Sequence, residues 1–315
     1  MKKILSIDGG GIRGIIPALV LAQIEKNTGK SIAESFDLIT GTSTGGILAL
    51  GLSKDNGHGK AKYSAQELVE IYEERGREIF PRSFWRGVSS VGGFIDELYA
   101  VEGLEKVLDE YFQNEPLGAS LTKVLISSYD IQNRTPLFFK SWRNEFRNVL
   151  MKEVARATSA APTYFEPAKV AIGTETKYLI DGGVFINSPS VSAYAEAERI
   201  FPDEKEFFVL SLGTGELIRP IPYDAAKDWG KAGWLLPLLS CMFDGVSDAA
   251  DYQLNSLLGD NYVRMQVKLD QSSDDMDDAS SGNIANLRAE AATLILTHAS
   301  GIGKTVQTLA PSAVS

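Results

Sequence analysis

Short apolar runs alternate with amphipathic segments along most of the chain. A run of four to eight apolar residues is typical of a buried strand, whereas apolar residues every three or four positions indicate a helix. Strands are predicted at residues 3–7, 36–42, 123–130, 136–141, 177–180, 207–212 and 262–269. Helices are predicted at residues 15–29, 45–52, 64–80, 101–112, 149–159, 190–200 and 284–297. This alternation predicts one α/β domain over residues 1–300, with a mostly parallel sheet, helices on both of its faces, and a weakly structured tail at 301–315.

Two segments allow more than one interpretation. Residues 81–99 are rich in aromatic residues and glycine, which fits either a packed irregular excursion or a flap beside an apolar pocket. Residues 229–243 are rich in Trp, Leu and Met, which fits either a core segment or an apolar face that meets lipid. The core is the simpler interpretation of this second segment.

Composition narrows the class of protein. The 315 residues are 44% hydrophobic and 23% charged, which is typical of a globular chain, and carry a net charge of −10. That charge argues against nucleic acid as a partner, because phosphate contacts require clustered Lys and Arg. The single cysteine, Cys241, excludes an internal disulfide and fits a reducing compartment. With no apolar run of about 18 residues, we expect a cytoplasmic protein that is at most peripheral at a membrane.

The first candidate for chemistry is a serine between two glycines. Residues 41–45 read Gly-Thr-Ser-Thr-Gly, the G-x-S-x-G pattern of a tight turn that presents a serine hydroxyl between a strand and a helix. Small residues at Gly41 and Gly45 are needed because strand and helix nearly touch there. The N-terminus of the new helix favours negative charge near Ser43.

A glycine loop follows the first predicted strand. Gly9, Gly10 and Gly11 precede a helix, an arrangement whose backbone N–H groups can bind an oxyanion or a phosphate. Arg13 either holds this loop or adds positive charge for a phosphate-bearing substrate, and we favour the first role. The loop also matches the dinucleotide pattern G-x-G-x-x-G through Gly14. That pattern requires an acidic residue at the end of the second strand, where Thr42 and Ser43 stand instead.

A serine nucleophile needs a base, and three residues are candidates. His58 lies in a polar loop, and His298 ends the last predicted helix. The order Ser43, Asp181, His298 matches that of α/β-hydrolases, so a Ser-Asp-His esterase is one alternative. The second-strand position of Ser43 and the helix-end position of His298 weigh against it.

Asp181 is the alternative base. It ends a predicted strand, and Gly182 and Gly183 let the backbone turn tightly after it. Carboxyl ends of strands meet at the ligand-binding edge of an open α/β sheet, so Asp181 and Ser43 are expected to converge. Partial burial is expected to raise the pKa of Asp181 and to make it a stronger base.

These motifs together resemble those of the patatin-like phospholipases. DGGGIRG at 8–14, GTSTG at 41–45 and DGG at 181–183 match the oxyanion, nucleophile and aspartate motifs of that family. ATSAAPTYF at 157–165, NSP at 187–189 and SLGTG at 211–215 match further family segments in the same order. The resemblance implies a three-layer α/β/α fold, a Ser43–Asp181 dyad, and hydrolysis of lipid acyl esters without metal or other cofactor.

The expected function is therefore lipid acyl hydrolysis of phospholipid or galactolipid at a membrane surface. An acyltransferase differs only in using an alcohol in place of water. The rival of another class is a non-catalytic nucleotide-binding switch that uses residues 9–14. The resemblance also admits an unidentified activator, and no oligomeric state follows from the sequence.

Overall fold

Eight strands form one mixed sheet at the centre of the fold. In the computed structural model, residues 1–80 and 101–310 are described, so the aromatic segment at 81–99 lies outside the described residues. The strands are β1 (Lys2–Ile7), β2 (Leu38–Gly41), β3 (Lys123–Asp130), β4 (Thr135–Lys140), β5 (Ala168–Ile172), β6 (Glu175–Asp181), β7 (Phe207–Leu212) and β9 (Tyr262–Met265). Two short strands, β8 (Glu216–Leu217) and β10 (Lys268–Leu269), pair separately.

The sheet is parallel through its centre and antiparallel at one side. Its order is β5-β6-β3-β2-β1-β7-β9, with β4 also paired to β3. From β3 through β2, β1 and β7 to β9, each strand is parallel to the next one in this order. By contrast, β4 and β6 both run antiparallel to β3, and β5 runs antiparallel to β6.

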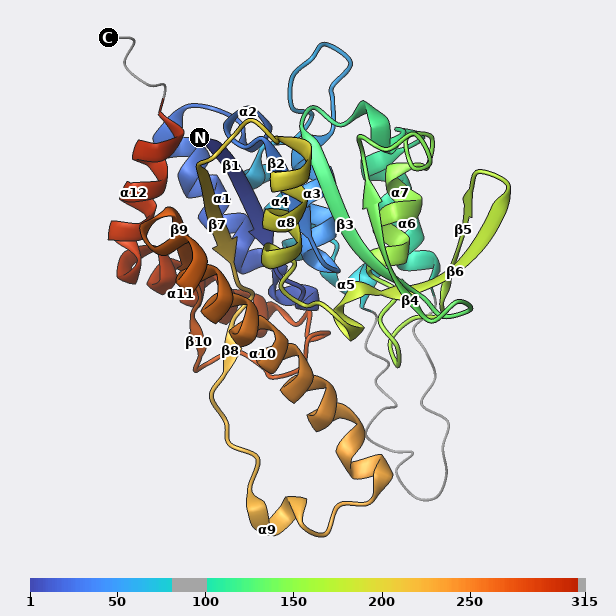
Figure 1. Cartoon of the computed structure of the whole chain (residues 1–315). Helices are drawn as coiled ribbons and strands as arrows, with labels where there is room; N and C mark the ends of the chain where they lie inside the picture. Colours follow the sequence, from blue (N-terminus) through green and yellow to red (C-terminus); the bar gives the residue numbers. More distant parts are fainter. Residues whose placement is uncertain (81–100, 311–315) are drawn as a thin grey trace.

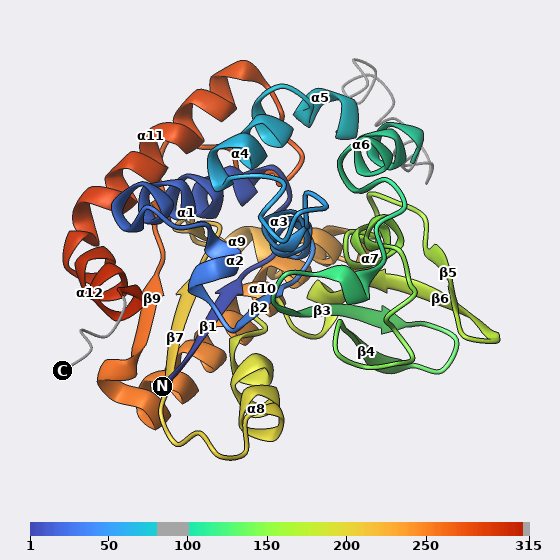
Figure 2. The same cartoon turned by 90° about the horizontal axis from the view of Figure 1, so that it is seen from above.

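Helices cover both faces of the sheet, as the three-layer prediction requires. They are α1 (Ile15–Thr28), α2 (Ile32–Ser35), α3 (Thr44–Ser53), α4 (Ala65–Glu73), α5 (Gly76–Ile79), α6 (Glu102–Phe112), α7 (Met151–Thr158), α8 (Ser190–Ile200), α9 (Tyr223–Ala226), α10 (Lys231–Leu258), α11 (Ser281–Thr297) and α12 (Ala299–Leu309). Figure 2 shows α1, α3, α4 and α11 on one side of the sheet and α8 on the other. The α/β/α architecture is therefore confirmed.

Alternation along the strands explains why two cores form. In β7, Phe208 and Leu210 pack into the larger core, whereas Phe207 and Val209 face the smaller core beneath α8. All four side chains are buried. Successive side chains of a strand point to opposite faces, so a continuous apolar run supplies both layers at once.

Two expectations about helices are wrong. The segment predicted as one helix at 64–80 forms α4 and α5, which are separate helices. Residues 301–309, predicted as weakly structured tail, belong to α12. Ile302, Thr305 and Leu309 of α12 are buried, so tertiary packing supports a helix whose glycines give it a weak helical signal.

One part of the chain projects from the body. Residues 218–242, which we call the arm, contain α9 and the first part of α10. Figure 1 shows the arm extending away from the sheet, at the end of the molecule where the parallel strands finish.

Candidate active site

Ser43 occupies a strained turn between β2 and α3. Its backbone has φ 55° and ψ −123°, in the region that favours glycine. Such strain is held only by surrounding contacts, and it is common at functional sites. Here the N–H of Ser43 donates to Thr158 Oγ1 at 2.9 Å, and Thr158 Oγ1 donates to the carbonyl of Ser127 at 2.7 Å. The strand β3 and the helix α7 therefore fix the serine backbone.

The two glycines that flank the serine are required by close packing. A Cβ atom on Gly45 would lie 2.2 Å from the Ile7 carbonyl oxygen of β1. A Cβ atom on Gly41 would lie 2.1 Å from the Gly45 carbonyl oxygen. Both distances are far below van der Waals contact with backbone, which cannot easily shift. The geometry agrees with the near contact of strand and helix that the sequence pattern predicts.

Asp181 lies against Ser43. Its carboxylate accepts a hydrogen bond from the N–H of Gly183 at 2.7 Å, and the Ser43 hydroxyl lies within hydrogen-bonding reach of the same carboxylate. Burial raises the pKa of Asp181 to about 6, and the contacts with Ser43 and Gly183 oppose the rise. At neutral pH the carboxylate is ionised, yet it is a much stronger base than an exposed aspartate.

The route by which Asp181 reaches Ser43 differs from the expected one. The prediction assumed that the carboxyl ends of parallel strands converge. In fact β6 runs antiparallel to β3, with Asp181 opposite Ser128. Because β3 is long and continues beyond its pairing with β2, the end of β6 returns along it toward Ser43.

Two of the three glycines predicted to supply oxyanion donors line the cavity that contains Ser43. The N–H of Gly9 donates to the Asn187 carbonyl at 3.2 Å, and Gly9 does not line the cavity that contains Ser43. Gly10 and Gly11 do line it. Gly11 has φ +59°, and a Cβ atom there would lie 2.2 Å from the Met276 carbonyl oxygen. Gly9 is therefore not available as an oxyanion donor in this conformation.

Arg13 binds the backbone of the glycine loop through its side chain. Its side chain is buried, and Nε donates to the Gly10 carbonyl at 3.3 Å. Burial lowers the pKa of Arg13, and the nearby carboxylates of Asp244 and Asp274 act against that decrease. Arg13 does not line the Ser43 cavity. This arrangement favours the loop-holding role over direct contact with a substrate phosphate.

The cavity around Ser43 and Asp181 has a volume of about 480 Å³. Most of its wall is apolar. The apolar side chains come from α3 to α6, from the segment after α7, and from the arm and α10. They include Ile47, Ile71, Ile79, Leu104, Phe165, Ile221, Trp229 and Phe243. An elongated apolar group is therefore a better fit to this wall than a nucleotide.

Neither histidine takes part in this site. His58 is exposed in the loop after α3, and His298 lies between α11 and α12, where its ring contacts the Thr297 hydroxyl. Neither lines the Ser43 cavity. The Ser-Asp-His alternative therefore has no geometric support. No group of three or more His, Cys, Asp or Glu residues suited to a metal ion occurs within residues 1–80 and 101–310.

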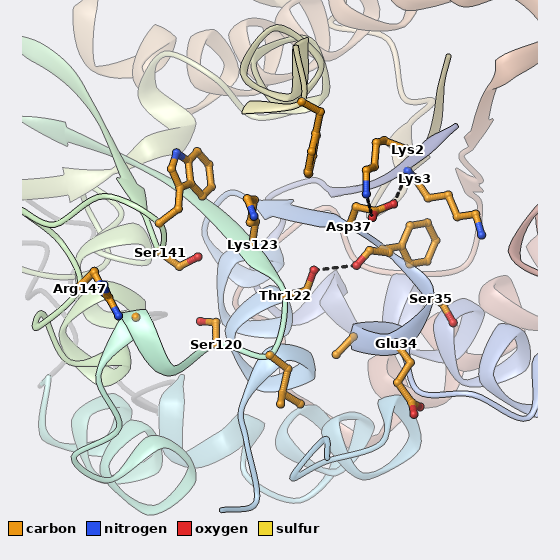
Figure 3. A pocket seen from close by; sticks show the side chains of 16 residues that line it. Lys2, Lys3, Glu34, Ser35, Asp37, Ser120, Thr122, Lys123, Ser141 and Arg147 are labelled. Atoms are coloured by element: carbon orange, nitrogen blue, oxygen red, sulfur yellow. Dashed lines mark hydrogen bonds and ion pairs between the residues drawn. The ribbon is translucent and has the colours of Figure 1, made fainter. Parts of the chain in front are cut away.

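A larger hollow of about 600 Å³ lies at the opposite end of the sheet. Figure 3 shows its polar lining, where Asp37 accepts hydrogen bonds from Lys2 Nζ at 2.8 Å and from the backbone N–H of Lys3 at 2.9 Å. The Thr122 hydroxyl donates to the Phe36 carbonyl there. These groups already satisfy one another, and the hollow has no nucleophile–base pair. We therefore assign the chemistry to the smaller, apolar cavity.

Sequence reasoning from chemistry alone missed the residues that bind the backbone of the Ser43 turn and of the glycine loop. Thr158 binds the Ser43 N–H, Asn187 binds the Gly9 N–H, and the Thr214 hydroxyl donates to the Gly9 carbonyl at 2.7 Å. The carbonyl of Met276 accepts the N–H of Ile12 at 2.8 Å. The first three lie in segments that were recognised only by resemblance. Met276 lies in the acidic and polar stretch of residues 270–281.

Sequence similarity to known proteins identifies the family of this chain. The sequence model of the patatin-like phospholipase family matches residues 5–194. The chain belongs to that family. Membership supports lipid acyl hydrolysis as the general activity.

Several plant proteins resemble this patatin-like chain over most of its length. Patatin-like protein 2 of Oryza sativa is 33% identical, over 91% of this chain and 82% of the relative. Patatin-like protein 4 of Arabidopsis thaliana is 32% identical, over 90% and 81%. Patatin-12 of Solanum tuberosum is 31% identical, over 94% and 84%. The solved structure of VipD from Legionella pneumophila aligns with 94% of this chain and with 67% of the VipD chain. The sequence identity is 14% and the TM-score is 0.41.

In the described part of the chain, no helix is both long enough and apolar enough to cross a bilayer.

Proposed function

We propose that this protein is a serine acyl hydrolase that cleaves fatty-acyl esters of phospholipids or galactolipids. The observation that carries the proposal is a serine hydroxyl within hydrogen-bonding reach of a buried carboxylate, with both residues lining an apolar cavity. A hydroxyl becomes an effective nucleophile when an adjacent base accepts its proton. Asp181 is that base.

The reaction follows from the positions of these groups. Ser43 Oγ attacks the ester carbonyl carbon while its proton moves to Asp181. The N–H groups of Gly10 and Gly11 bind the resulting oxyanion, with help from the N-terminus of α3. Asp181 then protonates the leaving alcohol, and an acyl-serine remains. A water molecule, deprotonated by the same carboxylate, attacks the acyl-serine and releases the fatty acid.

The pKa of Asp181 suits both halves of this cycle. General catalysis is most efficient when the pKa of the group lies near the working pH. With a pKa of about 6, Asp181 is mostly ionised at neutral pH but still able to hold a proton transiently. An exposed aspartate, with a pKa near 3.9, would be a much weaker base.

The substrate class is inferred from the cavity wall. Acyl chains are apolar and elongated, and the side chains of α3 to α6 offer them an apolar surface beside Ser43. The polar head group would remain near the mouth. Access to such a substrate requires the protein to work at a membrane surface, as a peripheral protein of the cytoplasmic side.

Product analysis with mixed lipid vesicles tests this proposal. Vesicles that contain phosphatidylcholine and galactolipid are incubated with the wild type, with Ser43→Ala and with Ser120→Ala, and the products are identified by mass spectrometry. Ser120 lies in the polar hollow at the far end of the sheet and serves as the matched control. We expect free fatty acid and lysolipid from the wild type and Ser120→Ala, and none above background from Ser43→Ala. Unchanged release by folded Ser43→Ala would refute the proposal.

A further inference from the structure

The arm carries a concentration of exposed apolar side chains. Twelve large hydrophobic residues are exposed in the described part of the chain, and six of them lie within residues 218–242. These six are Ile218, Ile221, Tyr223, Trp234, Leu238 and Met242. Tyr223 is 80% exposed and Leu238 is 50% exposed. A cluster of this kind on one projecting segment indicates an interaction surface.

Three large apolar residues of α10 form an exposed stripe beside the residues of the helix that line the cavity. Trp234, Leu238 and Met242 are spaced four apart, so they lie along one side of the helix. Pro237 and Cys241, by contrast, line the Ser43 cavity. The helical repeat puts the stripe roughly 100° around the helix from the lining side. One side of α10 thus closes the cavity, while the adjacent side faces solvent.

Trp234 of the stripe packs against a residue that lines the cavity. Its ring packs edge-to-face against Trp229, with ring centroids 5.3 Å apart, and Trp229 itself lines the cavity. Ile221, exposed on the segment before α9, also lines the cavity. Apolar surface is therefore continuous from the outside of the arm to the wall beside Ser43. A lipid chain could pass along it without entering water.

The charge of the arm also differs from that of the whole chain. The chain has a net charge of −10, whereas residues 218–242 contain three basic and two acidic residues. Asp224 and Lys227 of α9 form an ion pair at 2.9 Å. From 229 to 243 the only charged residue is Lys231. The arm is thus a part of this acidic protein that can approach a lipid surface without electrostatic repulsion.

We propose that the arm inserts the Trp234–Leu238–Met242 stripe into the surface of a zwitterionic or uncharged lipid bilayer, and so places the cavity mouth against the lipid. This inference rests on the proposed function for its choice of occupant. Tyr and Trp side chains are favoured at the bilayer–water interface, and Leu and Met bury well among acyl chains. Because the arm has little net charge, the attraction is apolar rather than electrostatic.

Vesicle sedimentation tests the proposal separately from catalysis. Ser43→Ala protein, which leaves the lipid intact, is mixed with vesicles of phosphatidylcholine alone, and the bound fraction is measured at low and high salt. Leu238→Asp in this background is compared with Leu257→Asp, a matched change on the same helix at a residue that is 64% exposed and outside the arm. We expect Leu238→Asp to weaken partitioning at least about tenfold, Leu257→Asp to stay within about twofold, and salt to have little effect.

Several results would overturn the proposal. In sedimentation, these are absence of vesicle binding by the Ser43→Ala protein, equal weakening of vesicle binding by Leu238→Asp and Leu257→Asp, or loss of vesicle binding at high salt. A dimer in analytical ultracentrifugation that Leu238→Asp dissociates would also overturn it, because the stripe would then bind a second copy of the chain. Circular dichroism, and hydrolysis of a soluble short-chain ester by Leu238→Asp with Ser43 intact, confirm that the variant is folded.

The same experiments separate this inference from the proposed function. Hydrolysis of the soluble ester without vesicle binding would overturn arm insertion and leave the Ser43 chemistry standing. Vesicle binding that depends on Leu238, without any hydrolysis by the wild type, would overturn the Ser43 chemistry and leave arm insertion standing.

Discussion

The hydroxyl of Ser43 lies within hydrogen-bonding reach of the carboxylate of Asp181, although the strands that carry them are separated by β3. Asp181 reaches this position because β6 returns antiparallel along β3 and ends opposite Ser128. Burial at that point raises the pKa of Asp181 to about 6. The return of β6 along β3 therefore determines the position of the carboxylate, and burial determines its basicity.

The first prediction concerns Thr158, which accepts the Ser43 N–H and donates to the Ser127 carbonyl. Thr158→Ala leaves a buried N–H without its acceptor, at a cost of about 1–3 kcal/mol. We expect a lower melting temperature and a reduced kcat, because the strained backbone of Ser43 loses its support. Thr158→Ser retains the hydroxyl and should keep most of the activity. Equal losses in the two variants would show that the methyl group, not the hydrogen bond, matters.

A second prediction concerns the contact between α3 and β1. In Gly45→Ala the new methyl group meets the Ile7 carbonyl, so helix and strand must move apart. We expect the free energy of unfolding to fall by about 1–3 kcal/mol, and ester hydrolysis to fall with it. Gly245→Ala is the matched control, since it lies in α10 with no atom within 4 Å of the added Cβ. It should raise stability by roughly 0.5–1 kcal/mol. Urea denaturation measures both.

The third prediction follows from the raised pKa of Asp181. Its folded pKa of about 6 exceeds its ordinary value of 3.8, so the folded state binds this proton more tightly than the unfolded state. The stability that this proton contributes is complete below pH 3.8 and is lost as the pH rises through about 6. Relative to Asp181→Asn, which does not titrate, the wild type should lose roughly 2 kcal/mol between pH 4 and pH 7. Urea denaturation of both proteins across this range measures the difference, and a constant difference would contradict the raised pKa.

Much of the fold and the two principal residues of the site could be predicted from the sequence, for identifiable reasons. A continuous apolar run such as Phe207–Leu212 suits only a strand buried on both faces. The glycines at 41 and 45 indicate a strand and helix that nearly touch. These are local signals, because each depends on residues that are neighbours in sequence.

What the sequence did not predict depends on long-range packing. The antiparallel direction of β6 leaves no mark on its own residues, and the convergence of Asp181 with Ser43 was expected for a different reason. Asn187, far away in sequence, takes the Gly9 N–H that was predicted to bind the oxyanion. The segment at 229–243 was interpreted as core, whereas Trp234, Leu238 and Met242 are exposed on the arm. Hydrophobicity alone does not distinguish a core from an interaction surface.

The most direct test of the central claim is the pH dependence of kcat/KM for a soluble ester, measured on the wild type, Asp181→Asn and His298→Ala. The account predicts that the wild-type value rises with pH and levels off above about 6, as Asp181 ionises. Asp181→Asn should be about 10²- to 10⁴-fold slower while still folded, and His298→Ala should match the wild type. A folded Asp181→Asn protein that keeps the wild-type rate and pH profile would contradict the claim that this carboxylate activates Ser43.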